Sequence, residues 1–229
     1  MRVCWLFYGD AWGFADLARR RQDDALKSLR LALAAVKKLR EAHPTVEYFL
    51  FSDTIVCLRE LPEDKEAEGK DVGFAELLLA VQFLVTELLE AGLLLRGVVT
   101  FGNLHREGDN EVVIGEALLD AAEFERTSVA PPLVFLPIAT LVRGRNAGRC
   151  SETLYKNNLK RSILIRTKDG GIIRAQPILG DKPKKLSQHL ERAFEAATTT
   201  ENYAARTAGA LQDALDIVTR VANSGRAQS

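Results

Sequence analysis

Two lone aspartates inside apolar runs place the strongest constraint on how this chain can fold. Asp10 interrupts an apolar and aromatic run at residues 7–14, and Asp53 interrupts a second one at residues 49–56. Aromatic and β-branched residues in short runs favour buried strands. An unpaired carboxylate in such surroundings is costly unless a cation meets it. The sequence therefore predicts that each aspartate lies at the end or bend of a strand, beside a cation.

A divalent metal ion is one cation that would satisfy both aspartates. Mg²⁺ is usually held by one or two protein carboxylates together with substrate phosphates, so two aspartates are enough. Gly9 and Gly13 flank Asp10 just before a segment with helical periodicity, an arrangement typical of a phosphate-binding loop. In the alternative interpretation, Asp10 caps the first helix and Asp53 is the turn residue of a hairpin. The residues alone leave both interpretations open.

Composition narrows the class of protein. The chain has 229 residues, of which 47% are hydrophobic and 27% charged, which is typical of one soluble globular domain. Lys and Arg total 31, as do Asp and Glu, and this neutral balance argues against a nucleic-acid partner. The three cysteines form no CxxC pair, which favours a reducing cytoplasm. We expect no secretory signal and no membrane span, because charged residues interrupt the apolar stretch at 77–99.

The periodicity of apolar residues predicts an α+β fold. Strands are expected at 2–9, 46–52, 54–60, 94–105, 111–114, 131–135, 162–166 and 172–177, and helices at 15–42, 74–91, 115–126 and 182–221, the last one broken near 198–200. This order is that of a ferredoxin-like palm, an antiparallel-rich sheet with helices packed on one face. We assign residues 1–145 to the core and residues 146–229 to a C-terminal hairpin and helical extension of the same domain.

Several motifs occur together in a recognisable order. The D-x-x-G-F pattern of Asp10, Gly13 and Phe14 is followed 43 residues later by Asp53 in a strand–turn–strand, and then by LRGVVTFG at 95–102, IGEAL at 114–118, EFE at 123–125 and PPLV at 131–134. This set resembles the catalytic domain of class III nucleotidyl cyclases over residues 3–140. Within that superfamily it is most similar to the bacterial pyrimidine (uridylate/cytidylate) cyclases of Pycsar antiphage signalling.

The resemblance implies a reaction and a site. Class III cyclases use two divalent ions, Mn²⁺ or Mg²⁺, to convert a nucleoside triphosphate to its 3′,5′-cyclic monophosphate and pyrophosphate. By resemblance, Asp10 and Asp53 would hold the metals. The β- and γ-phosphates would lie on the backbone of Ala11, Trp12, Gly13 and Phe14. Family members work as homodimers in which each protomer completes the other's pocket, and the cyclic nucleotide would act on a separate effector protein.

Two departures from the purine-cyclase pattern bear on the substrate. Adenylyl cyclases read adenine with a lysine four residues before the second aspartate, where this chain has Phe49. Phe49 would pack against a pyrimidine ring, so we expect a pyrimidine triphosphate, with UTP favoured by resemblance and CTP possible. The positions that contact ribose and the transition state hold Leu119 and Glu123. A glutamate cannot stabilise negative charge in phosphoryl transfer.

The position of Glu123 provides no cation to stabilise the negative charge of the transition state, and this leaves two interpretations open. Either the cation comes from elsewhere, or the fold is retained as an inactive nucleotide-binding module. We favour the first, because both aspartates are intact. Arg96 needs an anionic partner if it is buried, and would bind phosphate or pair with an aspartate. Lys156 and Lys160 precede the late strand, where cyclases keep a phosphate-binding lysine, although an exposed solubilising patch is the simpler account.

Overall fold

A computed structural model gives the fold. It describes residues 2–12, 14, 18–19, 21–64, 68–91, 93–107, 112–127, 131–166, 168–180, 182–199 and 205–226. The strands are β1 (Arg2–Ala11), β2 (Glu47–Phe51), β3 (Thr54–Glu60), β4 (Leu95–Glu107), β5 (Val112–Ile114), β6 (Val134–Pro137), β7 (Ile163–Arg166) and β8 (Ile172–Ile178). The helices are α2 (Gln22–Ala42), α3 (Val72–Glu90), α4 (Glu116–Thr127), α5 (Ile138–Asn146), α6 (Glu152–Lys160), α7 (Pro183–Thr199) and α8 (Ala205–Arg226).

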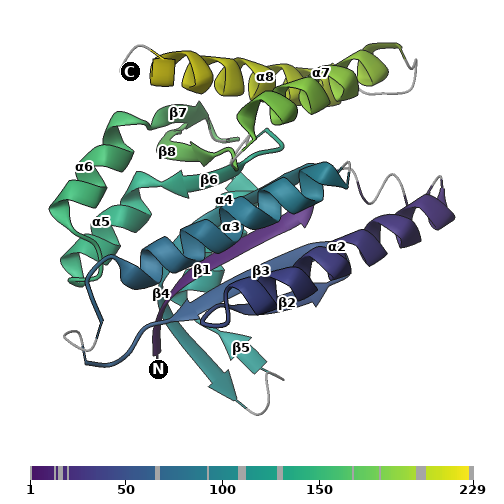
Figure 1. Cartoon of the computed structure of the whole chain (residues 1–229). Coiled ribbons are helices and arrows are strands. Elements are labelled where there is room, and N and C mark those ends of the chain that lie inside the picture. Colours follow the sequence, from purple (N-terminus) through teal and green to yellow (C-terminus); the bar gives the residue numbers. More distant parts are fainter. Residues whose placement is uncertain are drawn as a thin grey trace.

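The strands form one mixed sheet in the order β2-β3-β1-β4-β6-β8-β7, with β5 paired to the far end of β4. All neighbours are antiparallel except β4 and β6, which run parallel. Figure 1 shows β1 and β4 at the centre of this sheet. The predicted α+β class and the antiparallel-rich sheet are confirmed.

Helices cover both faces of the sheet. On β1, Trp5 and Phe7 belong to one hydrophobic cluster, together with side chains of α2, α3 and α5. Cys4 and Leu6 belong to a second cluster, with side chains of α4, α7 and α8. We expected helices on one face, and the structure differs because four consecutive side chains of β1 are buried. Since successive side chains point to opposite faces, both faces need a cover.

Helix α3 is the most apolar element and lies in front of the sheet in Figure 1. Among the described helices it is the one whose length and composition would allow it to cross a membrane, and just over half of that stretch is buried inside the fold. Its side chains Phe74, Leu77 and Leu84 are fully buried in the first cluster. This pattern is that of a core helix.

Helices α5 and α6 were not expected from the sequence, which left residues 136–161 unassigned. They lead into β7 and β8, and β8 pairs with β6, so the C-terminal hairpin continues the central sheet. The division between residues 145 and 146 falls in the last turn of α5.

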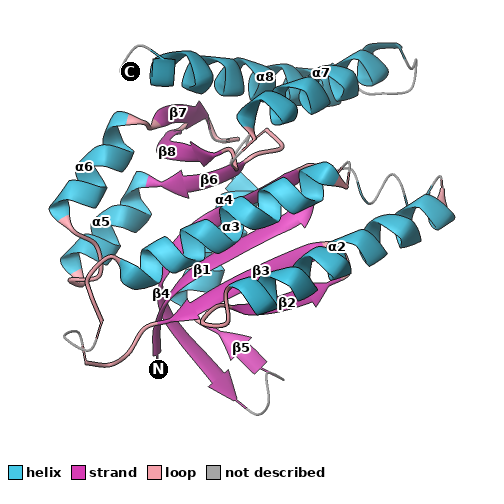
Figure 2. Ribbon diagram, in the orientation of Figure 1, coloured by secondary structure: helices cyan, strands magenta, loops and turns pink. Residues whose placement is uncertain are grey.

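Figure 2 shows α7 and α8 as a helix pair beside β7 and β8. Lys182 fixes α7 to the end of α3, with its Nζ 3.1 Å from Oε1 of Glu90.

Candidate functional site

The two aspartates lie at the same end of neighbouring strands. Asp10 occupies the penultimate position of β1, where it pairs with Thr54 of β3 on one side and Arg96 of β4 on the other. Asp53 lies in the turn between β2 and β3. The backbone N–H of Ala11 donates to the carbonyl oxygen of Asp53 at 3.1 Å. Antiparallel pairing therefore brings together two residues that are 43 positions apart in the sequence.

Local backbone features make this arrangement possible. Gly9 faces Gly97 across β1 and β4, and a Cβ on Gly9 would lie 2.5 Å from the Arg96 carbonyl oxygen and from the ring of Phe7. The two glycines therefore leave room for the ring of Phe7 across the strand pair, on the face of the sheet opposite to Asp10 and Arg96. In the β2–β3 turn, Ser52 has φ +57°, a left-handed conformation that is costly for a residue other than glycine.

Arg96 pairs with Asp10. Its Nε lies 3.1 Å from Oδ1 of Asp10, and its Nη2 lies 2.8 Å from Oδ2. The same Nη2 lies 3.2 Å from Oε1 of Glu125 on α4. All three side chains are between a fifth and two fifths exposed. Of the two roles that the sequence left open for Arg96, pairing with an aspartate is therefore realised here.

Tyr8 lies beside this network. Burial raises the pKa of its phenol, and the negative charges of Glu125 and Asp10 raise it further. The phenol is therefore protonated at neutral pH. A small cavity of about 20 Å³, enough for roughly one water molecule, lies among these side chains. Its lining residues are Tyr8, Gly9, Asp10, Arg96, Gly97, Val98, Phe124 and Glu125.

The donor set suits a hard divalent cation only in part. Within the described parts of the chain, no group of three or more His, Cys, Asp or Glu side chains could hold a metal. Asp10 and Asp53 supply two carboxylates at one strand end, which matches the way Mg²⁺ is bound with substrate phosphates. Both oxygens of Asp10 are already bonded to Arg96. The residues therefore fit a divalent ion whose remaining ligands are water or substrate phosphates, and which competes with a guanidinium for Asp10.

The predicted phosphate loop is only partly available. The N–H of Ala11 bonds to Asp53, and the N–H of Trp12 donates to the Leu94 carbonyl at 2.9 Å. Neither amide is free in this conformation, so phosphate binding by these two amides stays a prediction and would require both bonds to break. The side chain of Phe14 is buried against Ala11 and Ala25. Gly13 lies outside the described residues.

Phe49 is part of a short aromatic row on β2. Its ring is parallel to that of Phe51, with centroids 6.5 Å apart, and the guanidinium of Arg106 lies 5.6 Å from its centroid. Phe49 is half-buried, whereas Phe51 is 62% exposed. Phe51 adjoins the turn that carries Asp53, whereas the ring of Phe49 contacts Arg106, which pairs with Glu47 at the start of β2.

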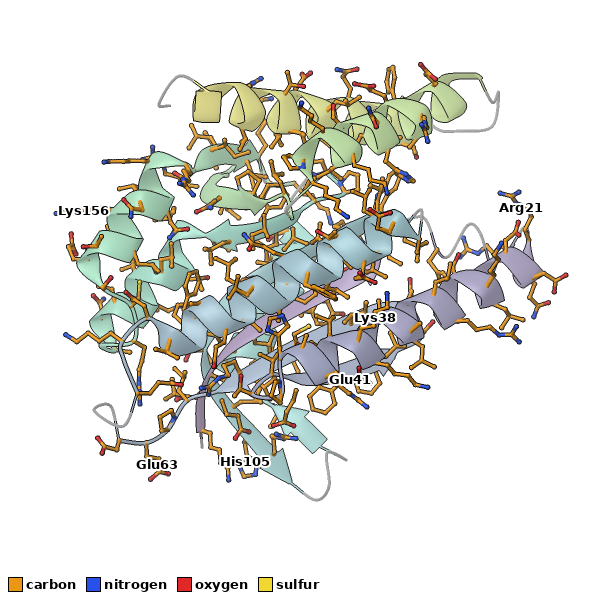
Figure 3. The ribbon with its side chains drawn as sticks, in the orientation of Figure 1. Arg21, Lys38, Glu41, Glu63, His105 and Lys156 are labelled. Carbon is orange, nitrogen blue, oxygen red and sulfur yellow. The ribbon has the colours of Figure 1, made fainter. Side chains whose placement is uncertain are left out.

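Lys156 and Lys160 lie on α6, away from the aspartates. Neighbouring side chains of α6 pack on the first cluster, whereas Asp10 lies on the same face of β1 as Cys4 and Leu6 of the second cluster. Nζ of Lys156 lies 3.4 Å from Glu152 on its own helix. Figure 3 shows Lys156 at the outer edge of the molecule. The structure thus brings together Asp10, Arg96 and the turn that carries Asp53, and leaves the two lysines and the ring of Phe49 apart from them.

Sequence reasoning did not assign Glu125 or Tyr8 to the site. A signal for Glu125 was present in α4, where Ala117, Ala121 and Phe124 are buried at helical spacing. Glu125 follows directly on this buried face, so its carboxylate is positioned at the boundary between core and solvent. Tyr8 precedes Asp10 by two positions and therefore shares its face of β1.

Comparison with known proteins gives likenesses in solved structures only. No family model matches the chain, and no curated protein matches it. A guanylate cyclase domain from Catenaria anguillulae, solved with GTP, is 12% identical over 76% of this chain and 94% of that one, with a TM-score of 0.47. An adenylate cyclase from Trypanosoma brucei is 12% identical over 77% and 88%, with a TM-score of 0.49.

A third similar structure is a class III adenylyl cyclase-like ATP-binding protein from Pseudomonas aeruginosa. It is 13% identical over 82% of this chain and 40% of that one, with a TM-score of 0.49. Sequence identities and TM-scores this low say nothing about the activity or the substrate of this chain.

Proposed function

We propose that this protein is a nucleotidyl cyclase that converts a pyrimidine nucleoside triphosphate to its 3′,5′-cyclic monophosphate and pyrophosphate. The observation that carries the proposal is the meeting of Asp10 and Asp53 at one strand end, through the 3.1 Å bond from Ala11 to the Asp53 carbonyl. The two carboxylates would hold two Mn²⁺ or Mg²⁺ ions. When bound, these ions supply charge neutralisation for the triphosphate and acidify the attacking hydroxyl.

The reaction is an in-line displacement. The 3′-oxygen of the ribose bonds to the α-phosphorus, the α–β anhydride bond breaks, and pyrophosphate leaves while the hydroxyl proton passes to solvent. Asp10 and Asp53 would hold the ions at the strand end where the triphosphate binds. Arg96 is the guanidinium nearest to this point, and once released from Asp10 it would face the negative charge of the phosphoryl group.

Phe49 and its aromatic neighbour support a pyrimidine substrate. A phenyl ring offers no hydrogen bond to a purine edge and packs against any flat ring. UTP is favoured and CTP is the second candidate, because the two differ by one or two hydrogen-bonding groups. The product would serve as a second messenger in antiphage defence, acting in the cytoplasm on a separate effector protein.

A homodimer with shared active sites is part of the proposal. Lys156 and Lys160 lie on the opposite face of the sheet from Asp10 in one chain. If either lysine contacts substrate phosphate, it does so across an interface with a second copy.

Incubation with each of the four ribonucleoside triphosphates and Mn²⁺ tests the proposal. We expect cyclic UMP or cyclic CMP, resolved by chromatography, from the wild-type protein. Asp53→Asn should lower the rate by about a thousandfold or more, since metal-assisted charge stabilisation is worth several kcal/mol. Asp24→Asn is the matched control, because Asp24 is half-exposed on α2 and its Oδ2 lies 3.2 Å from Nε of Arg21, a residue outside the candidate site. No cyclic product from any triphosphate would refute the proposal.

A second candidate function has its own observation. Arg96 already occupies both oxygens of Asp10, and the amides of Ala11 and Trp12 are bonded. These contacts favour an inactive cyclase-fold module that binds nucleotide for regulation. Such a module would bind a triphosphate in equilibrium dialysis and release it unchanged.

A further inference from the structure

Arg96 is shared by two carboxylates from different elements. Its Nη2 lies 2.8 Å from Oδ2 of Asp10 on β1 and 3.2 Å from Oε1 of Glu125 on α4. Asp10 alone would satisfy the guanidinium, because it already binds Arg96 through two parallel hydrogen bonds. Glu125 is therefore a surplus anion in the resting arrangement, and it lies in a partly buried site where surplus negative charge is unfavourable.

The proposed metal and Arg96 compete for the same oxygens. A divalent ion at 2.0–2.6 Å from a carboxylate oxygen, the usual coordination range, would lie close to the guanidinium that now bonds to both oxygens of Asp10. Two cations on one carboxylate repel each other strongly at low exposure. Metal binding at Asp10 therefore requires Arg96 to withdraw. A guanidinium that withdraws without a partner is left as an uncompensated, partly buried charge.

We propose that Glu125 is a positioning residue that takes over Arg96 when Asp10 binds a divalent ion. This inference rests on the proposed function. Nη2 is already within reach of Oε1 of Glu125, so a small rotation of the guanidinium moves it from one carboxylate to the other. Because Glu125 comes from α4, the exchange leaves the pairing of β1 with β4 unchanged. Arg96 then remains beside the metal and the substrate phosphates, with its charge balanced.

The proposal predicts a specific coupling between Glu125 and Arg96 in metal affinity. Mn²⁺ alone is titrated into the full-length protein and followed by the loss of the free Mn²⁺ electron paramagnetic resonance signal. Glu125→Gln should weaken binding about tenfold, because Arg96 then has Asp10 as its sole carboxylate and competes harder. Arg96→Gln should tighten binding. In the Arg96→Gln background, Glu125→Gln should change the affinity by less than about twofold.

Controls separate this exchange from a general effect of charge. Glu123→Gln removes the same charge two positions away on α4, where Glu123 is 55% exposed and pairs with Arg126, and should leave Mn²⁺ affinity within about twofold of wild type. Circular dichroism confirms that each variant is folded. Arg96→Lys is a second variant if Arg96→Gln does not fold, and it should give an intermediate affinity because lysine lacks the bidentate geometry.

Two outcomes would overturn the inference while the proposed function stands. If Glu125→Gln weakens Mn²⁺ binding equally in both backgrounds, Glu125 acts on the ion itself and not through Arg96. If it has no effect in either background, Glu125 takes no part in metal binding. Failure of the wild-type protein to bind Mn²⁺ at millimolar concentration would instead remove the metal site, and with it both proposals.

Discussion

The two ends of strands β1, β3 and β4 carry ionic networks with different charge balance. At one end, Arg106 contacts both Glu47 and Glu60, and Arg2 also contacts Glu60, so two cations meet two anions. At the other end, Arg96 is the one cation that pairs with Asp10 and Glu125 within the part of the chain that the structure describes, and Asp53 lies in the adjoining turn.

The contrast distinguishes a structural network from a binding site. Both groups lie on the same face of the sheet, since their β1 and β4 members occupy even-numbered positions of those strands. In a balanced network each charged side chain has a partner of opposite charge, and these pairs contribute to the stability of the fold. A network with surplus carboxylates lacks a cation that the described residues do not provide, as is common at functional sites that are not optimised for stability. The following predictions test this difference.

The largest effect is expected at the balanced end. Arg106→Gln leaves Glu47 and Glu60 without their shared partner and removes the cation over the Phe49 ring. Breaking a partly buried ion pair from one side should lower the free energy of unfolding by about 2–4 kcal/mol, measured by urea denaturation at pH 7. Arg126→Gln is the control, because Arg126 is 74% exposed and should change stability by less than about 0.5 kcal/mol.

Glu60→Gln should give a smaller loss that depends on pH. Burial raises the pKa of Glu60, but hydrogen bonds from Arg2 and Arg106 outweigh it, and the net pKa is lowered. The stability supplied by this carboxylate is therefore complete above its unfolded pKa of about 4.3 and is lost as the pH falls through the lower folded value. We expect a loss of about 1–2 kcal/mol at pH 7.

The same denaturation series at lower pH sharpens this prediction. Below about pH 4, where the unfolded carboxyl is mostly protonated, the difference between wild type and Glu60→Gln should shrink. A difference that stays constant down to pH 3 would show that Glu60 contributes by packing and not by charge.

At the unbalanced end, removing a carboxylate should cost little. Asp53→Asn reduces the surplus negative charge, so we expect a change in unfolding free energy within about 0.5 kcal/mol of zero. The control is Glu60→Gln, measured in the same buffer. A loss above about 2 kcal/mol for Asp53→Asn would favour the alternative interpretation of Asp53 as a structural turn residue.

The smallest effect concerns backbone strain beside Asp53. Ser52 has φ +57°, a conformation that glycine adopts without a Cβ penalty. Ser52→Gly should therefore stabilise the protein by about 0.5–1 kcal/mol, observed as a rise in Tm in calorimetry. A fall in Tm would show that the serine side chain, and not the backbone, determines the stability of the turn.

Much of the architecture was predictable because its signals are local. The hairpin expected at 46–60 is β2 and β3, and the helix expected at 74–91 is α3. Helix α5 escaped prediction because its buried side is made of Ile138, Thr140, Leu141 and Gly144, which gives a weak apolar stripe. Gly144 is needed there because a Cβ would lie 2.5 Å from the Trp5 indole, a contact made across distant parts of the sequence.

The sequence singled out candidate site residues but not the way they pair. Lone charges in apolar runs marked Asp10, Asp53 and Arg96, because burial of an unpaired charge is costly. That Arg96 pairs with Asp10 depends on the register of β1 against β4, which no local pattern specifies. The contribution of Glu125 depends in addition on the way α4 packs on these strands.

The central claim is that Asp10 and Asp53 act together on shared divalent ions, and Mn²⁺ titration of Asp10→Asn, Asp53→Asn and the double variant tests it most directly. We predict that each single variant weakens Mn²⁺ binding by about tenfold or more and that the double variant is no weaker than the weaker single one, because residues that act as a unit are non-additive. A single variant that binds Mn²⁺ as tightly as wild type would contradict the account.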